Sequence, residues 1–162
     1  MENAHYFLHV TDTHLCFDAE APDTCCTEQA LRSLYQTAFA WDHRPAFVLI
    51  TGDLVHEGTS ADYARAKTLL QELDEQYHTK TYPALGNHDI RKNFNSAFRG
   101  LASDQPLDYC VQNEWLRWIV LDSSCGQVIG QLSGSQLAWL EQELCEPTDC
   151  PTILALHHPV YG

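Results

Sequence analysis

Basic side chains are scarce in this chain. Nine lysines and arginines stand against 22 aspartates and glutamates over 162 residues, which gives a formal net charge of −13. Proteins that bind nucleic acid or anionic membranes through a general basic surface need the opposite balance, so the composition argues against both partners. An anionic substrate fits this charge where fixed metal cations reverse the local field. We therefore expect bound cations or a neutral substrate.

Long hydrophobic runs are also absent from the sequence. No apolar stretch approaches the roughly 20 residues that a membrane-spanning helix requires. The first ten residues contain Glu2, His5 and His9 where a signal peptide would carry its apolar segment. The hydrophobic content of 44% is nevertheless enough for a sizeable core. These features predict a soluble cytoplasmic protein in which residues 1–162 form one domain.

The seven cysteines do not form the paired C-x-x-C spacing of a zinc site. Cys25 and Cys26 are adjacent, and Cys145 and Cys150 flank the sequence Glu-Pro-Thr-Asp. The odd number of cysteines favours reduced thiols in a reducing compartment. A structural disulfide and a redox role are the alternatives.

What the chain does contain is an alternation of strand and helix patterns. Apolar runs of strand length alternate with segments whose apolar residues recur at helical spacing. The expected elements are a strand over 6–10, a helix from its cap Thr27 to about 41, a strand over 47–50, a helix over 60–76 capped by Ser60, and a strand over 80–85. This β-α-β-α-β order favours parallel neighbouring strands with right-handed crossovers.

The pattern is weaker after residue 89. The expected elements there are a short helix over 93–102, a hairpin of strands over 107–112 and 115–122, a helix that begins with a Ser133–Gln136 capping box, and a final strand over 152–156. Trp115 and Trp118 are interpreted as packing residues. The whole pattern predicts an α/β fold with a mixed sheet flanked by helices.

Side chains that can bind metals follow four of the apolar strands. The four stretches are Asp12-Thr13-His14, Gly52-Asp53, Gly86-Asn87-His88-Asp89 and His157-His158-Pro159. Residues i and i+2 of an extended chain point to the same side, so Asp12 and His14 can face one ion. The Asp53 carboxylate has two oxygens and can bridge two cations. Each residue taken alone also fits a cap or a solvated loop, but the ordered set indicates a metal site.

Nitrogen and oxygen ligands without thiolate suit Mn, Fe, Zn or Co better than a structural zinc cluster. Two such cations about 3.5–4 Å apart can clamp a phosphate and activate water for attack on phosphorus. The ligand types therefore point to hydrolysis of a phosphoester.

The ordered motifs resemble those of the calcineurin-like metallophosphoesterases. Within that family the chain is most similar to the class III cyclic-nucleotide phosphodiesterases and their glycerophosphodiesterase relatives. The matching pieces are Thr11–Leu15, Thr51–Val55, Pro83–Asp89, Leu121–Ser123 and Leu156–Pro159, together with the helical segment Leu132–Leu144. The resemblance covers essentially the whole chain, and Gly-Asn-His-Asp is a specific motif.

The resemblance implies a site for two divalent metal ions. Asp12, His14 and Asp53 would hold one ion, and Asp53 would bridge to a second ion that Asn87 and His157 also bind. Iron or manganese is the expected metal, with zinc or cobalt as alternatives.

The resemblance also implies which residues act on the substrate. His88 would stabilise developing charge on the phosphate or protonate the leaving oxygen. Asp89 would orient His88 by accepting its other N–H. Asn87 and Arg91 would also contact the substrate, and His158 would support the metal ligands from behind.

The implied function is a metal-dependent phosphodiesterase that converts a 3′,5′-cyclic nucleotide such as cyclic AMP to the 5′-nucleotide. Its partner would be a small phosphodiester substrate rather than nucleic acid or membrane, and a homodimer is compatible with it. The alternatives are a glycerophosphodiesterase, another small-phosphoester hydrolase, or an inactive metal-binding remnant.

One family motif does not occur in the sequence. Family members continue to a Gly-His-x-His motif whose two histidines complete the metal sites, whereas this sequence runs only to Gly162. We therefore expect a C-terminally truncated metallophosphoesterase-type sandwich in which each metal site lacks one histidine.

Overall fold

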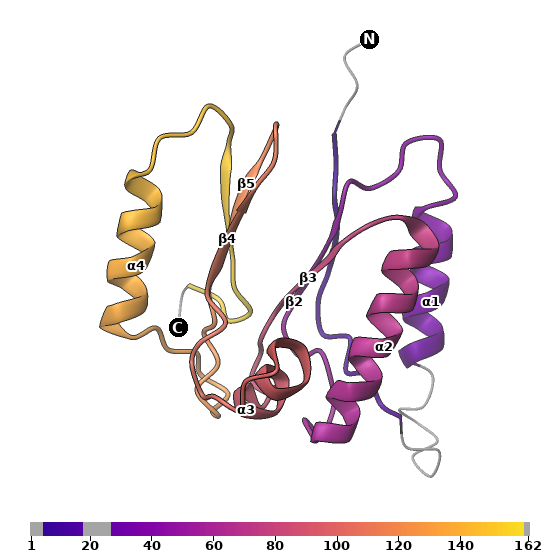
Figure 1. Ribbon diagram of the computed structural model, residues 1–162, viewed down its shortest axis with the longest axis horizontal. Coiled ribbons are helices and arrows are strands. Elements are labelled where there is room, and N and C mark those ends of the chain that lie inside the picture. Colours follow the sequence, from indigo (N-terminus) through magenta and orange to yellow (C-terminus); the bar gives the residue numbers. More distant parts are fainter. Residues whose placement is uncertain (1–4, 18–26, 161–162) are drawn as a thin grey trace.

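The computed structural model describes residues 5–17 and 27–160. Two β-sheets face each other at the centre of the molecule, with helices α1 and α2 outside one sheet and helix α4 outside the other (Figure 1). This arrangement confirms the predicted α/β sandwich of mixed strands flanked by helices.

The first sheet is parallel and has the order β1-β2-β3. Its strands are β1 (Leu8–Val10), β2 (Val48–Thr51) and β3 (Thr81–Ala84), and the connecting helices are α1 (Thr27–Ala38) and α2 (Ser60–Tyr77). The central strand β2 is buried along its whole length, as its unbroken apolar sequence predicts for a strand covered on both faces. The predicted parallel β-α-β-α-β order is thus confirmed.

The second sheet is mixed. Strand β4 (Tyr109–Gln112) pairs antiparallel with β5 (Arg117–Val120), and β5 pairs parallel with β6 (Thr152–Ala155). Helix α4 (Gly134–Cys145) connects β5 to β6. The predicted hairpin and the final strand are therefore both present.

Aromatic side chains fill the space between the sheets. The rings of Phe47 and Trp118 stack with their centroids 4.1 Å apart, and Tyr82 meets Trp118 edge-on at 4.9 Å. Trp115 also stacks on Phe47. Both tryptophans are packing residues, as predicted. A second core lies between the first sheet and helices α1 and α2, and includes the buried rings of Tyr35 and Tyr63.

Two predicted helix boundaries were wrong. Thr59, not Ser60, caps α2: its hydroxyl accepts the Asp62 backbone N–H, and the Asp62 carboxylate accepts the Thr59 N–H. The short helix expected over 93–102 begins earlier, as α3 (Arg91–Phe94), and continues as a π-helical turn (Asn95–Arg99). Helix α1 starts at Thr27, and its expected cap borders residues outside the described ranges. The Ser133–Gln136 capping box of α4 is confirmed.

Among the described cysteines, Cys110, Cys125, Cys145 and Cys150 are free thiols. Cys25 and Cys26 lie outside the described residues. No helix in the described part of the chain has both the length and the apolar composition needed to cross a bilayer.

Candidate metal centre

The strand ends of both sheets meet at one edge of the sandwich. The loops after β1 and β2 run side by side, since the backbone N–H groups of Asp12 and His14 donate to the carbonyl oxygens of Gly52 and Asp53 at 3.1 and 2.8 Å. The loop after β3 joins them because the His88 N–H donates to Asp53 Oδ1 at 2.9 Å. The predicted site residues of the first sheet are therefore neighbours.

Three residues of this edge have left-handed backbone conformations that side chains other than glycine rarely adopt. The φ angles are 53° at Asp12, 39° at His14 and 50° at Asp53. Within the described ranges the remaining non-glycine residue of this kind is His78, which ends helix α2. Strained backbone concentrates at functional sites because the surrounding structure must hold it in place. Its location here marks these loops as the candidate site.

Asp53 lies between two histidines. Its Oδ2 atom is 3.5 Å from His14 Nε2 and 3.7 Å from His157 Nε2, and its side chain is only 5% exposed. Asp12 Oδ1 is 3.9 Å from His14 Nε2 on the side toward solvent. One ligand atom each from Asp12, His14 and Asp53 lies within 4.8 Å of the others. Asp53 can therefore bridge two ions, one beside His14 and one beside His157.

The hydrogen bonding of His157 leaves a lone pair directed at two oxygens. Its Nδ1 lies 3.0 Å from the Thr51 carbonyl oxygen, which can only accept, so Nδ1 carries the proton. In the neutral ring Nε2 then has no proton and faces Asn87 Oδ1 at 3.2 Å and Asp53 Oδ2 at 3.7 Å. Three electron-pair donors that converge in this way form a suitable binding site for a cation.

Two glycines make this close approach possible. A Cβ atom at Gly52 would lie 2.4 Å from His157 Nδ1, and one at Gly86 would lie 2.2 Å from Asp53 Oδ1. Any larger residue would therefore displace a candidate ligand. Both glycines thus serve the site directly.

The residues present fit a pair of divalent cations. Donor atoms that share an ion with bonds of about 2.0–2.2 Å lie about 3–3.5 Å apart, close to the separations of 3.2–3.9 Å found around Asp53. The set combines carboxylate, amide and imidazole donors, which first-row divalent metals accept. The structure brings Asp12, His14, Asp53, Asn87 and His157 together as predicted.

Asp89 has partners different from the expected one. Its Oδ2 accepts the backbone N–H groups of Leu54 and Gly86 at 3.1 and 2.9 Å, and its Oδ1 accepts the Tyr63 hydroxyl at 2.9 Å. Burial raises the pKa of the Asp89 carboxyl to about 6, although these three hydrogen bonds act in the opposite direction. The expectation that Asp89 orients the His88 ring is therefore wrong, because its carboxylate binds the loop after β2, its own loop and Tyr63 of helix α2 instead.

The backbone of His56 takes the role expected of Asp89. His88 Nδ1 lies 3.2 Å from the His56 carbonyl oxygen, which therefore fixes a proton on Nδ1. The His88 ring is exposed and meets the His14 ring edge-on, with centroids 4.8 Å apart. Sequence reasoning missed His56, because it stands three residues after Asp53 in a loop, outside every recognised motif.

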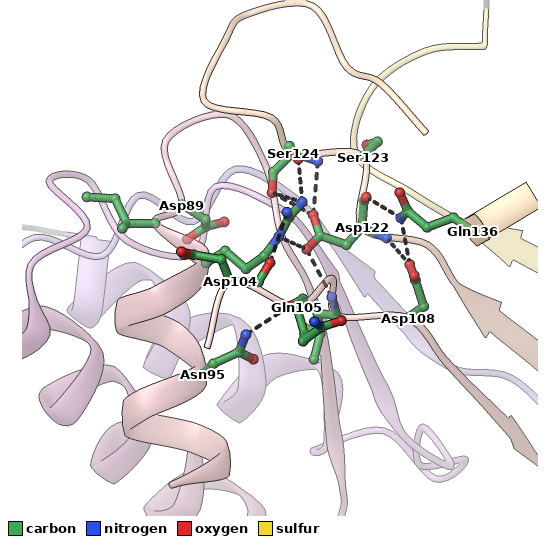
Figure 2. A network of polar contacts seen from close by, with 12 residues as sticks. Asp89, Asn95, Asp104, Gln105, Asp108, Asp122, Ser123, Ser124 and Gln136 are labelled. Atoms are coloured by element: carbon green, nitrogen blue, oxygen red, sulfur yellow. Dashed lines mark hydrogen bonds and ion pairs between the residues drawn. The ribbon is translucent and has the colours of Figure 1, made fainter. Parts of the chain in front are cut away.

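Arg91 binds protein groups rather than pointing freely at the site. Its Nε lies 2.8 Å from the fully buried carboxylate of Asp122, and its Nη2 donates to the Ser124 carbonyl oxygen. Figure 2 shows the polar network around Asp122, in which Gln136 bridges the Asp108 carboxylate and the Asp122 carbonyl oxygen. The Arg91 guanidinium thus connects the helix after the Asn87 loop to the end of β5.

The neighbouring Ser123 holds the second histidine of the late motif. Its hydroxyl lies 2.8 Å from His158 Nδ1, and the His158 ring packs edge-on against His157. Burial is the main reason that the pKa of His158 is lowered. The buried His158 therefore lies between Ser123 and the His157 ring.

Comparison with known proteins finds one matching family and several relatives of this chain. The model of the family described as calcineurin-like phosphoesterase matches residues 5–162. A probable cyclic nucleotide phosphodiesterase of Rhodococcus erythropolis is 38% identical over 157 residues, which are 96% of this chain and 52% of that protein. A cAMP/cGMP dual specificity phosphodiesterase of Mycobacterium tuberculosis is 36% identical over 94% of this chain and 49% of its own length.

Two further proteins are similar to this chain in sequence or in fold. A glycerophosphodiester phosphodiesterase of Enterobacter lignolyticus is 33% identical over 72% of this chain and 42% of its own length. A crystal structure of a dimetal phosphatase from Danio rerio matches with a TM-score of 0.70 over 99% of this chain and 71% of that one, at 13% identity, and so shares the fold. The chain spans about half the length of the cyclic nucleotide phosphodiesterases named above.

Proposed function

The chain belongs to the calcineurin-like phosphoesterase family, and we propose that it carries the metal-binding and proton-transfer residues of a phosphodiesterase. The proposed reaction is hydrolysis of a 3′,5′-cyclic nucleotide, such as cyclic AMP, to the 5′-nucleotide. The observation that carries the proposal is the convergence of His157 Nε2, Asn87 Oδ1 and Asp53 Oδ2, which fits a bound cation. The names of the two cyclic nucleotide phosphodiesterases described above support the choice of substrate.

The proposed ligands divide into two groups that share Asp53. Asp12 and His14 hold one ion with it, and Asn87 and His157 hold the other. When bound, such cations supply Lewis-acid polarisation of a phosphate and activate water for in-line attack. Iron or manganese is the proposed metal, and zinc or cobalt also suits the mixed nitrogen and oxygen donors.

His88 is the proposed acid–base residue. The His56 carbonyl oxygen fixes a proton on its Nδ1, so its Nε2 remains to exchange a proton with the leaving oxygen of the substrate. Asn87 can also contact the phosphate through its amide. Arg91 is not carried into this proposal because its guanidinium is bound to Asp122.

The proposed partner is a small anionic substrate and not nucleic acid, since the net charge of −13 repels a polyanion away from the bound cations. Residues 1–162 as one incomplete domain, a cytoplasmic location and a homodimer stay predictions.

Hydrolysis by the Asn87→Ala variant tests the assignment. We expect cyclic AMP and bis(p-nitrophenyl) phosphate to be hydrolysed in the presence of Mn²⁺, and the variant to lose about a hundredfold or more in rate, equivalent to about 2.7 kcal/mol of barrier. Gln29→Ala, which removes an exposed amide from α1, is the matched control and should leave the rate unchanged. Turnover by Asn87→Ala at the wild-type rate would reject the site.

Glycerophosphodiester hydrolysis is the second candidate, because a glycerophosphodiester phosphodiesterase is among the relatives. Parallel assays with cyclic AMP and glycerophosphocholine separate the two substrates. Metal analysis tests both: close to two ions per chain with turnover supports an enzyme, whereas less than one ion and no turnover supports an inactive metal-binding remnant.

A further inference from the structure

Three histidine rings pack against one another beside the candidate metal centre. The ring of His56, on the loop after β2, has no role in the proposed hydrolysis, in which this residue acts only through its carbonyl oxygen. Its ring centroid lies 5.6 Å from that of His14 and 5.8 Å from that of His88, and the His14 and His88 rings are 4.8 Å apart. The three rings therefore form a closed triangle.

The nitrogen atoms of this triangle are close enough to share a metal ion. One ring nitrogen from each of His14, His56 and His88 lies within 4.8 Å of the other two. Three nitrogens bound tetrahedrally to zinc at about 2.05 Å lie about 3.3 Å from one another, so closure requires shifts of about 1 Å. The side chains of His14 and His56 are 31% and 36% exposed and that of His88 is exposed, which leaves room for these shifts.

The chemistry of this triangle differs from that of the centre around Asp53. The centre around Asp53 offers mainly oxygen donors, from Asp12, Asp53 and Asn87, whereas the triangle offers imidazole alone. Imidazole suits zinc and its neighbours in the affinity series better than manganese or magnesium. Glu57 Oε1, 3.5 Å from His56 Nε2, adds negative charge beside the triangle and favours a cation there.

We propose that His14, His56 and His88 form a third metal site, for zinc, which shares His14 with one of the two sites around Asp53. The two arrangements compete, because His14 belongs to both. Zinc bound by the triangle removes His14 from the ion beside Asp53 and removes His88 from the substrate. This inhibitory consequence rests on the proposed function, but the zinc site itself does not.

Equilibrium binding of metal to the full chain tests the site. The metal-free protein is titrated calorimetrically with Zn²⁺ and, separately, with Mn²⁺, for the wild type, His56→Gln and the control His43→Gln. His43 is an exposed histidine that precedes β2, at the end of the strand opposite the site. We expect His56→Gln to weaken zinc binding about tenfold or more and to leave manganese binding within about twofold, while His43→Gln leaves both unchanged.

Two further measurements exclude an indirect effect. Co²⁺ added to the wild type should give the strong visible absorption of a tetrahedral ion, and His56→Gln should lose it. His56→Cys supplies a different zinc ligand at the same position and should retain zinc binding within about tenfold of the wild type. These measurements record metal binding, so they test the zinc site independently of whether the chain hydrolyses a substrate.

Three outcomes would overturn the proposal. The first is zinc binding by His56→Gln with wild-type affinity and stoichiometry. The second is an equal loss of zinc and manganese binding in that variant, which would make His56 a support of the Asp53 centre. The third is loss of zinc binding in His56→Cys despite an unchanged melting temperature.

Discussion

Asp89 joins the loop after β2, the loop after β3 and helix α2 through one buried carboxylate. Its oxygens accept the backbone N–H groups of Leu54 and Gly86 and the hydroxyl of Tyr63. Because the carboxyl is 6% exposed, burial disfavours its charge and raises its pKa to about 6. A carboxyl with a raised pKa stabilises the fold at low pH, whereas a salt-bridged aspartate, whose pKa is lowered, stabilises it at higher pH.

The pH dependence of stability should reveal this carboxyl. The folded chain binds the Asp89 proton more tightly than the unfolded chain, whose aspartate has an ordinary pKa near 3.8. Its contribution to stability is therefore fully present below about pH 4 and is lost as the pH rises to about 6. We expect the stability of metal-free wild type minus that of Asp89→Asn to fall over this interval, measured by urea denaturation at successive pH values. A difference that stays constant would contradict the raised pKa.

Gly52 shows why a residue without a side chain can decide metal binding. It has φ = +90°, and a Cβ atom there would lie 2.4 Å from His157 Nδ1. We expect Gly52→Ala to cost about 1–2 kcal/mol in backbone strain. It should also weaken Mn²⁺ binding about tenfold or more, because it pushes the His157 ring away from Asn87. Urea denaturation and calorimetric titration measure the two effects.

Gly134→Ala is the matched control for this prediction. Gly134 opens helix α4, and a Cβ there meets no atom within 4 Å. The substitution should leave metal binding unchanged and be neutral or stabilise the fold by up to about 1 kcal/mol. Equal effects of the two substitutions on metal affinity would show that the contact with His157 is unimportant.

At the scale of single elements, helix α2 depends on its first turn. Thr59 and Asp62 form a reciprocal capping box that satisfies backbone N–H groups which the helix itself leaves without partners. The adjacent hydroxyl of Ser60 belongs to the first helical residue and is exposed. Two neighbouring hydroxyl side chains therefore contribute differently to the same helix end.

The two alanine variants should separate these roles. We expect Thr59→Ala to lower the free energy of unfolding by about 1 kcal/mol, in the range for loss of an N-cap, and Ser60→Ala to change it by less than about 0.5 kcal/mol. Chemical denaturation of both variants measures the difference. A larger loss of unfolding free energy from Ser60→Ala than from Thr59→Ala would show that Ser60 caps the helix, as the sequence pattern suggested.

At the scale of the whole molecule, residues 122–124 connect the two sheets through the loops that carry the site. Asp122 binds Arg91, which follows the Asn87 loop, and Ser123 binds His158, which follows His157. Asn87 and His157, the proposed ligands of the second ion, therefore come from different sheets, and one short segment at the end of β5 binds residues close to both. The distance between these two ligands depends on how the sheets are joined.

Removal of the Asp122 carboxylate tests this connection. Asp122→Ala leaves the Arg91 guanidinium, 23% exposed, without its charged partner. Loss of one partner from a buried pair typically costs about 3–5 kcal/mol, and we expect a loss of that order in urea denaturation together with weaker Mn²⁺ binding. Asp104→Ala is the control, since Arg91 contacts only the backbone carbonyl oxygen of that exposed residue. An unchanged stability in Asp122→Ala would mean that other contacts join the sheets.

The sequence by itself determined the order of strands and helices and the four stretches that carry the candidate metal ligands. Both depend on local features: apolar runs, helical spacing, and polar residues placed directly after strands. Parallel strands bring their carboxyl ends to one edge, so Asp12, Asp53 and Asn87 had to meet once the strands were recognised. The resemblance to a known family added which five residues in these stretches are the expected ligands, and the roles of the others.

Only the tertiary structure decided the partners of Asp89, Arg91 and His56. The Asp89 carboxylate accepts the Leu54 N–H, the Arg91 guanidinium donates to the Ser124 carbonyl oxygen, and the His56 carbonyl oxygen meets the His88 ring. Each contact joins residues far apart in the sequence, and one partner of each is a backbone group, which every residue carries. A contact between a side chain and the backbone of a distant loop leaves no pattern along the chain. It is specified by the packing of the two sheets, which exists only in the folded protein.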